Sequence, residues 1–168
     1  MKILALDPGN TRTAWLRYDS ETKLPVDFGY ESNEDVRAKL KQEADNLPIF
    51  SDIDILAIEW ISSYGMQAGQ EIFMTCFWVG RFVDCWTGKH MLIVRPDIKI
   101  HLCNNRSAKD KFVREALIFK FGQSAEEAIG NRKKPGPLYG IAGDVWSSLA
   151  VAVTVAENLA NYGLKKEM

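Results

Sequence analysis

Two short, mostly apolar runs that each end at an acidic residue constrain this sequence more than any other feature. Residues 2–6 end at Asp7, in an Asp-Pro-Gly turn, and residues 53–58 end at Glu59. Apolar runs of this length, bounded by turn residues, predict buried strands. The Ala- and Val-rich stretch 144–162 predicts a buried helix, and it also begins at an acidic residue. Three acidic residues are therefore expected at the ends of buried elements.

The other elements follow from the spacing of apolar residues and from turn signals. Two more strands are expected early in the chain, so that it opens as an antiparallel meander. Charged segments with apolar residues at helical spacing follow, and they alternate with further strands. A mobile loop is expected within residues 122–139. The expected strands are 2–6, 13–18, 26–30, 53–58 and 91–94, and the expected helices are 34–47, 67–86, 108–121 and 144–162.

This order of elements indicates the fold class. Strands first, followed by helices that alternate with strands, predict an α/β fold with a mixed central sheet and helices on both faces. The length of 168 residues fits one domain, residues 1–168. The helix expected at 67–86 has an apolar surface too wide for a single stripe, so part of it is expected to pack on a second subunit.

Each of the three acidic residues has a structural explanation when taken alone. Asp7 suits a turn, Glu59 suits the point where a strand reaches solvent, and Asp144 suits a helix N-cap. Taken together, they are expected to converge at one edge of the sheet, where like charges repel unless a cation compensates them. Oxygen ligands without His or Cys favour Mg²⁺ or Mn²⁺. Two such ions, about 3.5–4 Å apart, support phosphodiester cleavage.

The net charge of −1 is unevenly distributed along the chain. Residues 95–134 carry ten Lys and Arg against five Asp and Glu, whereas the rest carries eleven against seventeen. Such a basic segment fits a surface that contacts phosphate groups, and it equally fits a solvated helix and loop. The candidate DNA-binding residues are Lys99, Arg106, Lys109, Lys111, Arg114, Arg132, Lys133 and Lys134.

Four motifs, in this order and over essentially the whole chain, resemble the RuvC family of Holliday-junction resolvases. The first two are an apolar strand with its acidic turn and a second acidic strand end. The third is a basic segment in two parts, and the fourth is the start of the last helix. They are residues 3–13 (ILALDPGNTRT), 56–59 (LAIE), 95–99 (RPDIK) with 108–113 (AKDKFV), and 144–152 (DVWSSLAVA).

The resemblance implies an RNase H-like fold, a homodimer and Mg²⁺-dependent paired nicks across a four-way DNA junction. By position, Asp7, Glu59 and Asp144 would be the catalytic metal ligands, with Asp7 bridging two ions. Lys99 and either Lys109 or Lys111 would contact the DNA backbone or stabilise transition-state charge. The implied function is a structure-selective endonuclease that resolves Holliday junctions or other branched DNA. The composition is also typical of a phage-encoded member.

One position departs from the family pattern. The last motif of the family usually has a second acid three residues after the first, and here Ser147 stands at that place. A hydroxyl is a poorer metal ligand than a carboxylate. Three arrangements are open: Asp144 serves alone, Ser147 acts through water, or another acid such as Asp110 reaches the site.

Alternative functions fit some of the same residues. A weakly active or inactive RuvC-like DNA-binding module fits Ser147 and the near-neutral charge. Residues 7–11 (DPGNT) also resemble the phosphate-binding turn of actin-like and sugar-kinase ATPases, which need two such domains. Among nuclease substrates, RNA–DNA hybrids, flaps and replication forks stay open. Trp60 and Tyr64 fit either insertion between bases at the junction or packing of the loop that follows the strand.

The remaining features concern the compartment. Cys76, Cys85 and Cys103 have no Cys-x-x-Cys pair and no His at zinc spacing, so reduced structural thiols are expected. No apolar stretch approaches the roughly 20 residues that span a bilayer, and Asp7 comes too early for a secretory signal. The protein is expected in the cytoplasm of a bacterial or phage-infected cell, without membrane contact or a nucleotide cofactor.

Overall fold

A mixed sheet of five strands lies at the centre of the fold, in the order β3-β2-β1-β4-β5. The computed structural model describes residues 1–168 except 42–49, 51, 63–64, 66–68 and 163–168. The first three strands form an antiparallel meander, and the other two run parallel to the first. This confirms the predicted sheet. The strands are β1 (Lys2–Pro8), β2 (Arg12–Asp19), β3 (Leu24–Ser32), β4 (Ile55–Trp60) and β5 (Lys89–Val94).

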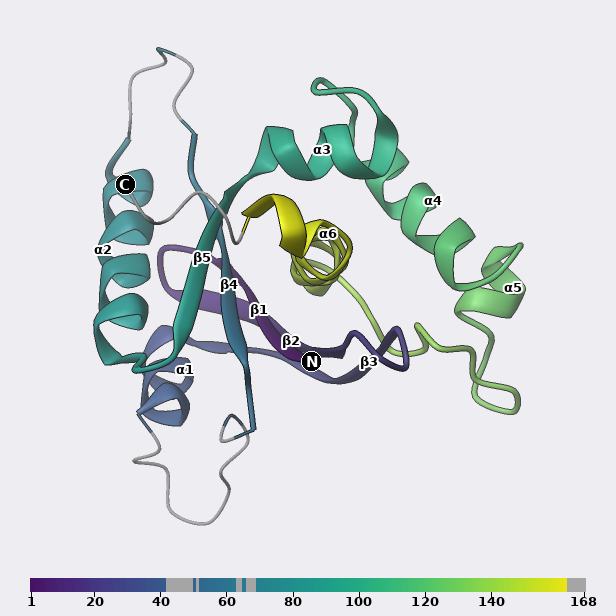
Figure 1. The fold of residues 1–168 in the computed structure, drawn as a ribbon, viewed down its shortest axis with the longest axis horizontal. Coiled ribbons are helices and arrows are strands. Elements are labelled where there is room, and N and C mark those ends of the chain that lie inside the picture. Colours follow the sequence, from purple (N-terminus) through teal and green to yellow (C-terminus); the bar gives the residue numbers. More distant parts are fainter. Residues whose placement is uncertain (42–49, 51, 63–64, 66–68, 163–168) are drawn as a thin grey trace.

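Helices cover both faces of the sheet, as predicted (Figure 1). On one face lie α1 (Asn33–Leu40) and α2 (Gln70–Cys85). On the other face α6 (Val145–Tyr162) lies directly on β1 and β2, and α3 and α4 pack against α6. The bounds of the remaining helices are Arg95–Cys103 for α3, Asp110–Phe121 for α4 and Ala125–Ala128 for α5.

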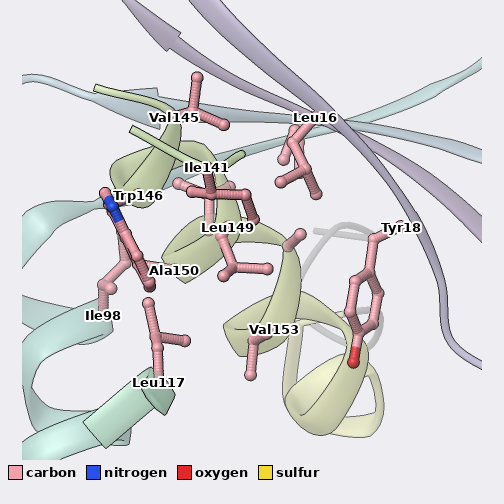
Figure 2. Close-up of a cluster of buried hydrophobic side chains, with 14 of the residues drawn as sticks. Leu16, Tyr18, Ile98, Leu117, Ile141, Val145, Trp146, Leu149, Ala150 and Val153 are labelled. Atoms are coloured by element: carbon pink, nitrogen blue, oxygen red, sulfur yellow. The ribbon is translucent and has the colours of Figure 1, made fainter. Parts of the chain in front are cut away.

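Two hydrophobic clusters, one on each face, hold these layers together. The larger one joins the sheet to α6, α3 and α4, and Figure 2 shows Leu149 and Val153 of α6 between Leu16 of β2 and Leu117 of α4. The smaller one joins the sheet to α1 and α2 and includes Trp78. The predicted burial of the last helix is confirmed, since its residues from Leu149 to Val155 are almost completely buried.

Several predicted bounds were wrong. The helix expected at 34–47 ends at Leu40, with Lys41 as its C-cap, and the rest of that range falls mostly outside the described residues. The last helix begins at Val145, so Asp144 precedes it. Residues 95–103 form a helix that was not predicted, because a proline soon after the strand expected at 91–94 also suits the end of that strand. A proline in the first turn is compatible with a helix, since the N–H that it lacks has no partner there.

The segment 122–139, predicted as a loop, contains the short helix α5 and a tight turn. Backbone hydrogen bonds of 3.0 and 3.1 Å join Asn131 to Lys134, and Gly130 pairs with Pro135. Gly130 has a φ of +66°, and a Cβ there would lie 2.2 Å from the carbonyl oxygen of Lys134. The turn therefore requires glycine at this position and holds the basic residues 132–134 at its exposed tip.

Candidate active site

Asp7 and Glu59 lie beside each other at the ends of two parallel strands. Leu6 of β1 is in register with Ile58 of β4, so the two acids follow at the next level. Leu6 and Ile58 belong to the cluster beneath α1 and α2. Because successive side chains of a strand point to opposite faces, Asp7 and Glu59 face α6 and α3. The predicted meeting of these two residues therefore follows from the register of the sheet.

The turn after Asp7 is held by a buried polar network. The N–H of Gly9 donates to the carbonyl of Arg12 at 2.8 Å, and a Cβ at Gly9 would lie 2.7 Å from that oxygen. The side-chain amide of Asn33 donates to the carbonyl of Gly9 at 3.1 Å, and the hydroxyl of Thr13 donates to Asn33 Oδ1 at 2.7 Å. These contacts hold the end of β1, and with it Asp7, in one position.

The electrostatics of the pair reflect burial and like charge. Burial and, next in size, the Glu59 carboxylate raise the pKa of Asp7 to about 7, against the opposing effects of Arg95 and a hydrogen bond from Ser147. Burial also raises the pKa of Glu59, against the opposing effect of Arg95. Two largely buried carboxylates in this position form a site that favours a cation.

Asp7 is expected to make the stability of the metal-free protein depend on pH. Because its pKa is about 7 in the fold and 3.8 ordinarily, the folded protein retains a proton that the unfolded chain releases in that range. The free energy of unfolding should therefore fall by about 1–3 kcal/mol as pH rises from about 4 to about 7. Urea unfolding in EDTA at several pH values measures this. The Asp7→Asn variant should lose this part of the slope, and an unchanged slope would contradict the assignment.

Arg95 occupies the other side of Glu59. It is the first residue of α3, directly after β5, the strand next to β4. Its Nη1 donates to Glu59 Oε2 at 2.9 Å and to Ser147 Oγ at 3.1 Å, and its Nη2 lies 2.9 Å from Asp110 Oδ1. Burial lowers the pKa of Arg95, but the Glu59 and Asp110 carboxylates outweigh this and raise it. The guanidinium is therefore a permanent positive charge within the acidic site.

Sequence reasoning missed the role of Arg95. The residue was part of the RPDIK motif, but only Lys99 of that motif was assigned a role. Lys99 lies one turn further along α3, and its Nζ lies 3.4 Å from Asp110 Oδ1. The sequence contained one indication of this role: Arg95 directly follows β5, the strand that pairs with β4, and β4 carries Glu59. The hydrogen bond of Arg95 lowers the pKa of Asp110, which is thus engaged by two cations.

Ser147 and Asp144 lie at the start of α6. The Ser147 hydroxyl donates to Asp7 and accepts from Arg95, so it links the two. Asp144 is exposed, and its charge raises the pKa of Asp7 less than the charge of Glu59 does. Both residues line a cavity of about 400 Å³ together with Arg95 and Asp110. Among the described residues, no three acidic, His or Cys side chains stand close enough as they are to hold a metal ion.

The predicted DNA-binding residues fall into two groups. Lys111 and Arg114 of α4 line the cavity beside Ser147, and Arg114 lies over the Trp146 ring at 4.7 Å. The N-cap of α4 is Lys109, and a neighbouring cavity of about 430 Å³ is lined by Arg95, Lys99 and Arg106 among others. The second group, Arg132, Lys133 and Lys134, lies beyond α5 and away from the start of α3 (Figure 1).

The aromatic predictions have separate outcomes. Trp146 is 9% exposed and belongs to the larger core cluster. Trp60, the last residue of β4, is partly buried against the smaller cluster, which is the packing alternative. Tyr64 lies outside the described residues.

The three cysteines are free thiols. Across the described part of the chain, no helix combines the length and apolar character needed to span a bilayer.

Two solved RuvC structures share this fold. The Thermus thermophilus RuvC structure matches with a TM-score of 0.69 and 14% identity, covering 96% of both chains. Thermus thermophilus RuvC in complex with a Holliday junction substrate matches with a TM-score of 0.64 and 13% identity, again covering 96% of both. No family model and no curated protein matches the sequence. The chain therefore has the RuvC-like, RNase H-like fold that the motifs predicted, and its phage origin stays a prediction.

Proposed function

We propose that the chain is a divalent-cation-dependent endonuclease that cuts Holliday junctions or other branched DNA, with residues 1–168 acting as one nuclease domain. The observation that carries the proposal is the pair of Asp7 and Glu59 at adjacent strand ends of a RuvC-like sheet. A buried pair of like charges is costly unless a cation compensates it. The chemistry of these oxygen donors suits Mg²⁺ or Mn²⁺.

The carboxylates available to hold a cation are those of Asp7, Glu59 and Asp144. When bound there, a divalent cation would activate a water molecule and stabilise charge on the leaving oxygen of a phosphodiester. Ser147 orients the Asp7 carboxylate through its hydrogen bond. Lys99, whose Nζ lies 3.4 Å from Asp110 Oδ1, is placed to engage phosphate oxygens instead when DNA is bound.

The DNA backbone would lie along α4 and the start of α3. Lys111 and Arg114 border the cavity that Asp144 and Ser147 line, and Lys109 is the N-cap of the same helix, so phosphates held by these residues would run past the acidic site. These contacts carry charge but little sequence information, so selectivity would come from the shape of the DNA. The Arg132–Lys134 turn would contact a more distant part of a branched substrate.

A second copy of the chain would supply the second nick of a junction. The face of α2 presents Ile72, Phe73, Met74 and Phe77, with Phe73 64% exposed and Phe77 54% exposed. An apolar patch of this kind on a helix favours burial against another protein surface. A symmetric pair formed through α2 would place two equivalent sites on one four-way junction.

Labelled substrates of defined shape test the proposal. With Mg²⁺, the protein should nick two opposing strands of a four-way junction and leave linear duplex DNA of the same sequence intact. Forks, flaps and RNA–DNA hybrids, assayed in parallel, define the substrate range. The serine at position 147, where the family usually has an acid, and the contact of Arg95 with Glu59 also fit an inactive DNA-binding module. Junction binding without cleavage at any Mg²⁺ or Mn²⁺ concentration would therefore favour the module and exclude the nuclease.

A further inference from the structure

The contacts of Arg95 bear on how many divalent cations this site holds. Nη1 of Arg95 lies 2.9 Å from Glu59 Oε2 and 3.1 Å from Ser147 Oγ. Mg²⁺ binds its oxygen ligands at about 2.0–2.1 Å. An ion shared by Glu59 and residue 147 would need the space between these two oxygens, and the guanidinium fills it.

Position 147 supports the same interpretation. Its hydroxyl is used twice within the protein, as a donor to Asp7 and as an acceptor from Arg95. A carboxylate at position 147 would supply the negative charge that a second divalent cation needs. A neutral hydroxyl, whose hydrogen and oxygen are both already used in hydrogen bonds, supplies no such charge. The exchange of acid for serine and the presence of an arginine beside it are therefore complementary.

The guanidinium is held firmly in this place. Its side chain is 24% exposed and that of Glu59 is 15% exposed, so both lie largely away from water. Asp110 anchors the other guanidinium nitrogen at 2.9 Å and is itself balanced by Lys99. Ion pairs that are partly buried and supported by further hydrogen bonds are costly to break.

The balance of charge points to a single ion. When all three are ionised, as cation binding requires, Asp7, Glu59 and Asp144 together carry three negative charges, and Arg95 compensates one of them. The remaining two match one divalent cation. Among the described residues, neither Asp7 nor Asp144 has a cationic side chain within ion-pair distance, so these two carboxylates are the ones left to bind it.

We infer that Arg95 takes the place of a second divalent cation, so that the site binds one ion, held by Asp7 and Asp144, with the guanidinium resident at Glu59. This inference rests on the proposed function and replaces the two ions expected from the sequence. It assigns Arg95 a positioning and charge-compensating role that no motif of the sequence indicated.

Counting bound Mn²⁺ tests the inference without measuring activity. Free Mn²⁺ is determined by electron paramagnetic resonance during titration of the protein. The wild-type chain should bind one Mn²⁺ per chain. The Arg95→Gln/Ser147→Asp variant, which removes the guanidinium and restores an acid, should bind two, with the affinity of the second position raised by at least about tenfold. Circular dichroism verifies that the variant is folded.

Lys99→Gln is the matched control, because it removes the same charge one turn along α3 but has no contact with Glu59. It should still bind one ion. Two ions in the wild-type chain would overturn the inference while leaving the proposed function in place. One ion in the folded double variant, or two in Lys99→Gln, would also overturn it. No bound Mn²⁺ in the wild type would overturn both the inference and the proposed function.

Discussion

Replacement of Asp7 by Asn is expected to reduce Mg²⁺-dependent cleavage of a four-way junction by at least about 10³-fold. Asp7 lies beside Glu59 at the centre of the acidic site, and Ser147 donates a hydrogen bond to it. An amide has nearly the same shape but lacks the charge that compensates a divalent cation. The loss should therefore appear in the rate of cleavage at saturating protein, measured on labelled junctions.

Binding of the junction by Asp7→Asn should survive, because the change removes a negative charge from a surface that faces phosphates. Gel-shift titration in EDTA measures this, with an affinity expected to equal or exceed that of the wild type. The control is Asp27→Asn, which removes the same charge from an exposed position on the edge strand β3. It should cleave normally. Wild-type cleavage by Asp7→Asn would remove the proposed nuclease site.

The second large effect is expected from α4. The triple change Lys109→Gln, Lys111→Gln and Arg114→Gln removes three positive charges from α4 and its N-cap, two of which line the acidic cavity. If each contacts one phosphate, the slope of log affinity against log salt should become shallower by about 2–3. At about 0.15 M salt the affinity for a junction should fall by roughly 10²-fold, and the fall should be similar for junctions of different sequence.

A matched triple variant separates specific contacts from overall charge. Lys23, Lys41 and Lys89 lie in the β2–β3 turn, after α1 and at the start of β5, and the first and last of these lie at the opposite end of the sheet from Asp7. Their replacement by Gln changes net charge equally and should alter the salt slope by less than about 1. Equal losses in the two triple variants would indicate general attraction, with no DNA path along α4.

The neighbouring positions of Asp7 and Glu59 were predictable because they depend on short-range patterns. Apolar runs predicted the two strands, and an acid directly after each run marked its end. The residues then meet because the strands are parallel and paired, with Leu6 opposite Ile58. Burial of the last helix was predictable for the same reason, since its Ala and Val content allows close packing on a sheet.

Other features of the site were not predictable from local pattern. A proline at position 96 suits the end of a strand and also the first turn of a helix, and only the packing of α3 against α6 and α4 decides between them. Asp144 was grouped with the other two acids, yet it is exposed and influences Asp7 least of the charged groups resolved.

The sequence by itself determined the strands, the faces they bury and the two acids at their ends, because alternation and apolar runs are properties of neighbours along the chain. Only the tertiary structure decided what Glu59 contacts. The long side chain of Arg95 has many rotamers, and its choice depends on Ser147 of α6 and Asp110 of α4, which are distant in sequence. Long-range packing places those two groups around the guanidinium, so the charge balance of the site is a property of the assembled fold.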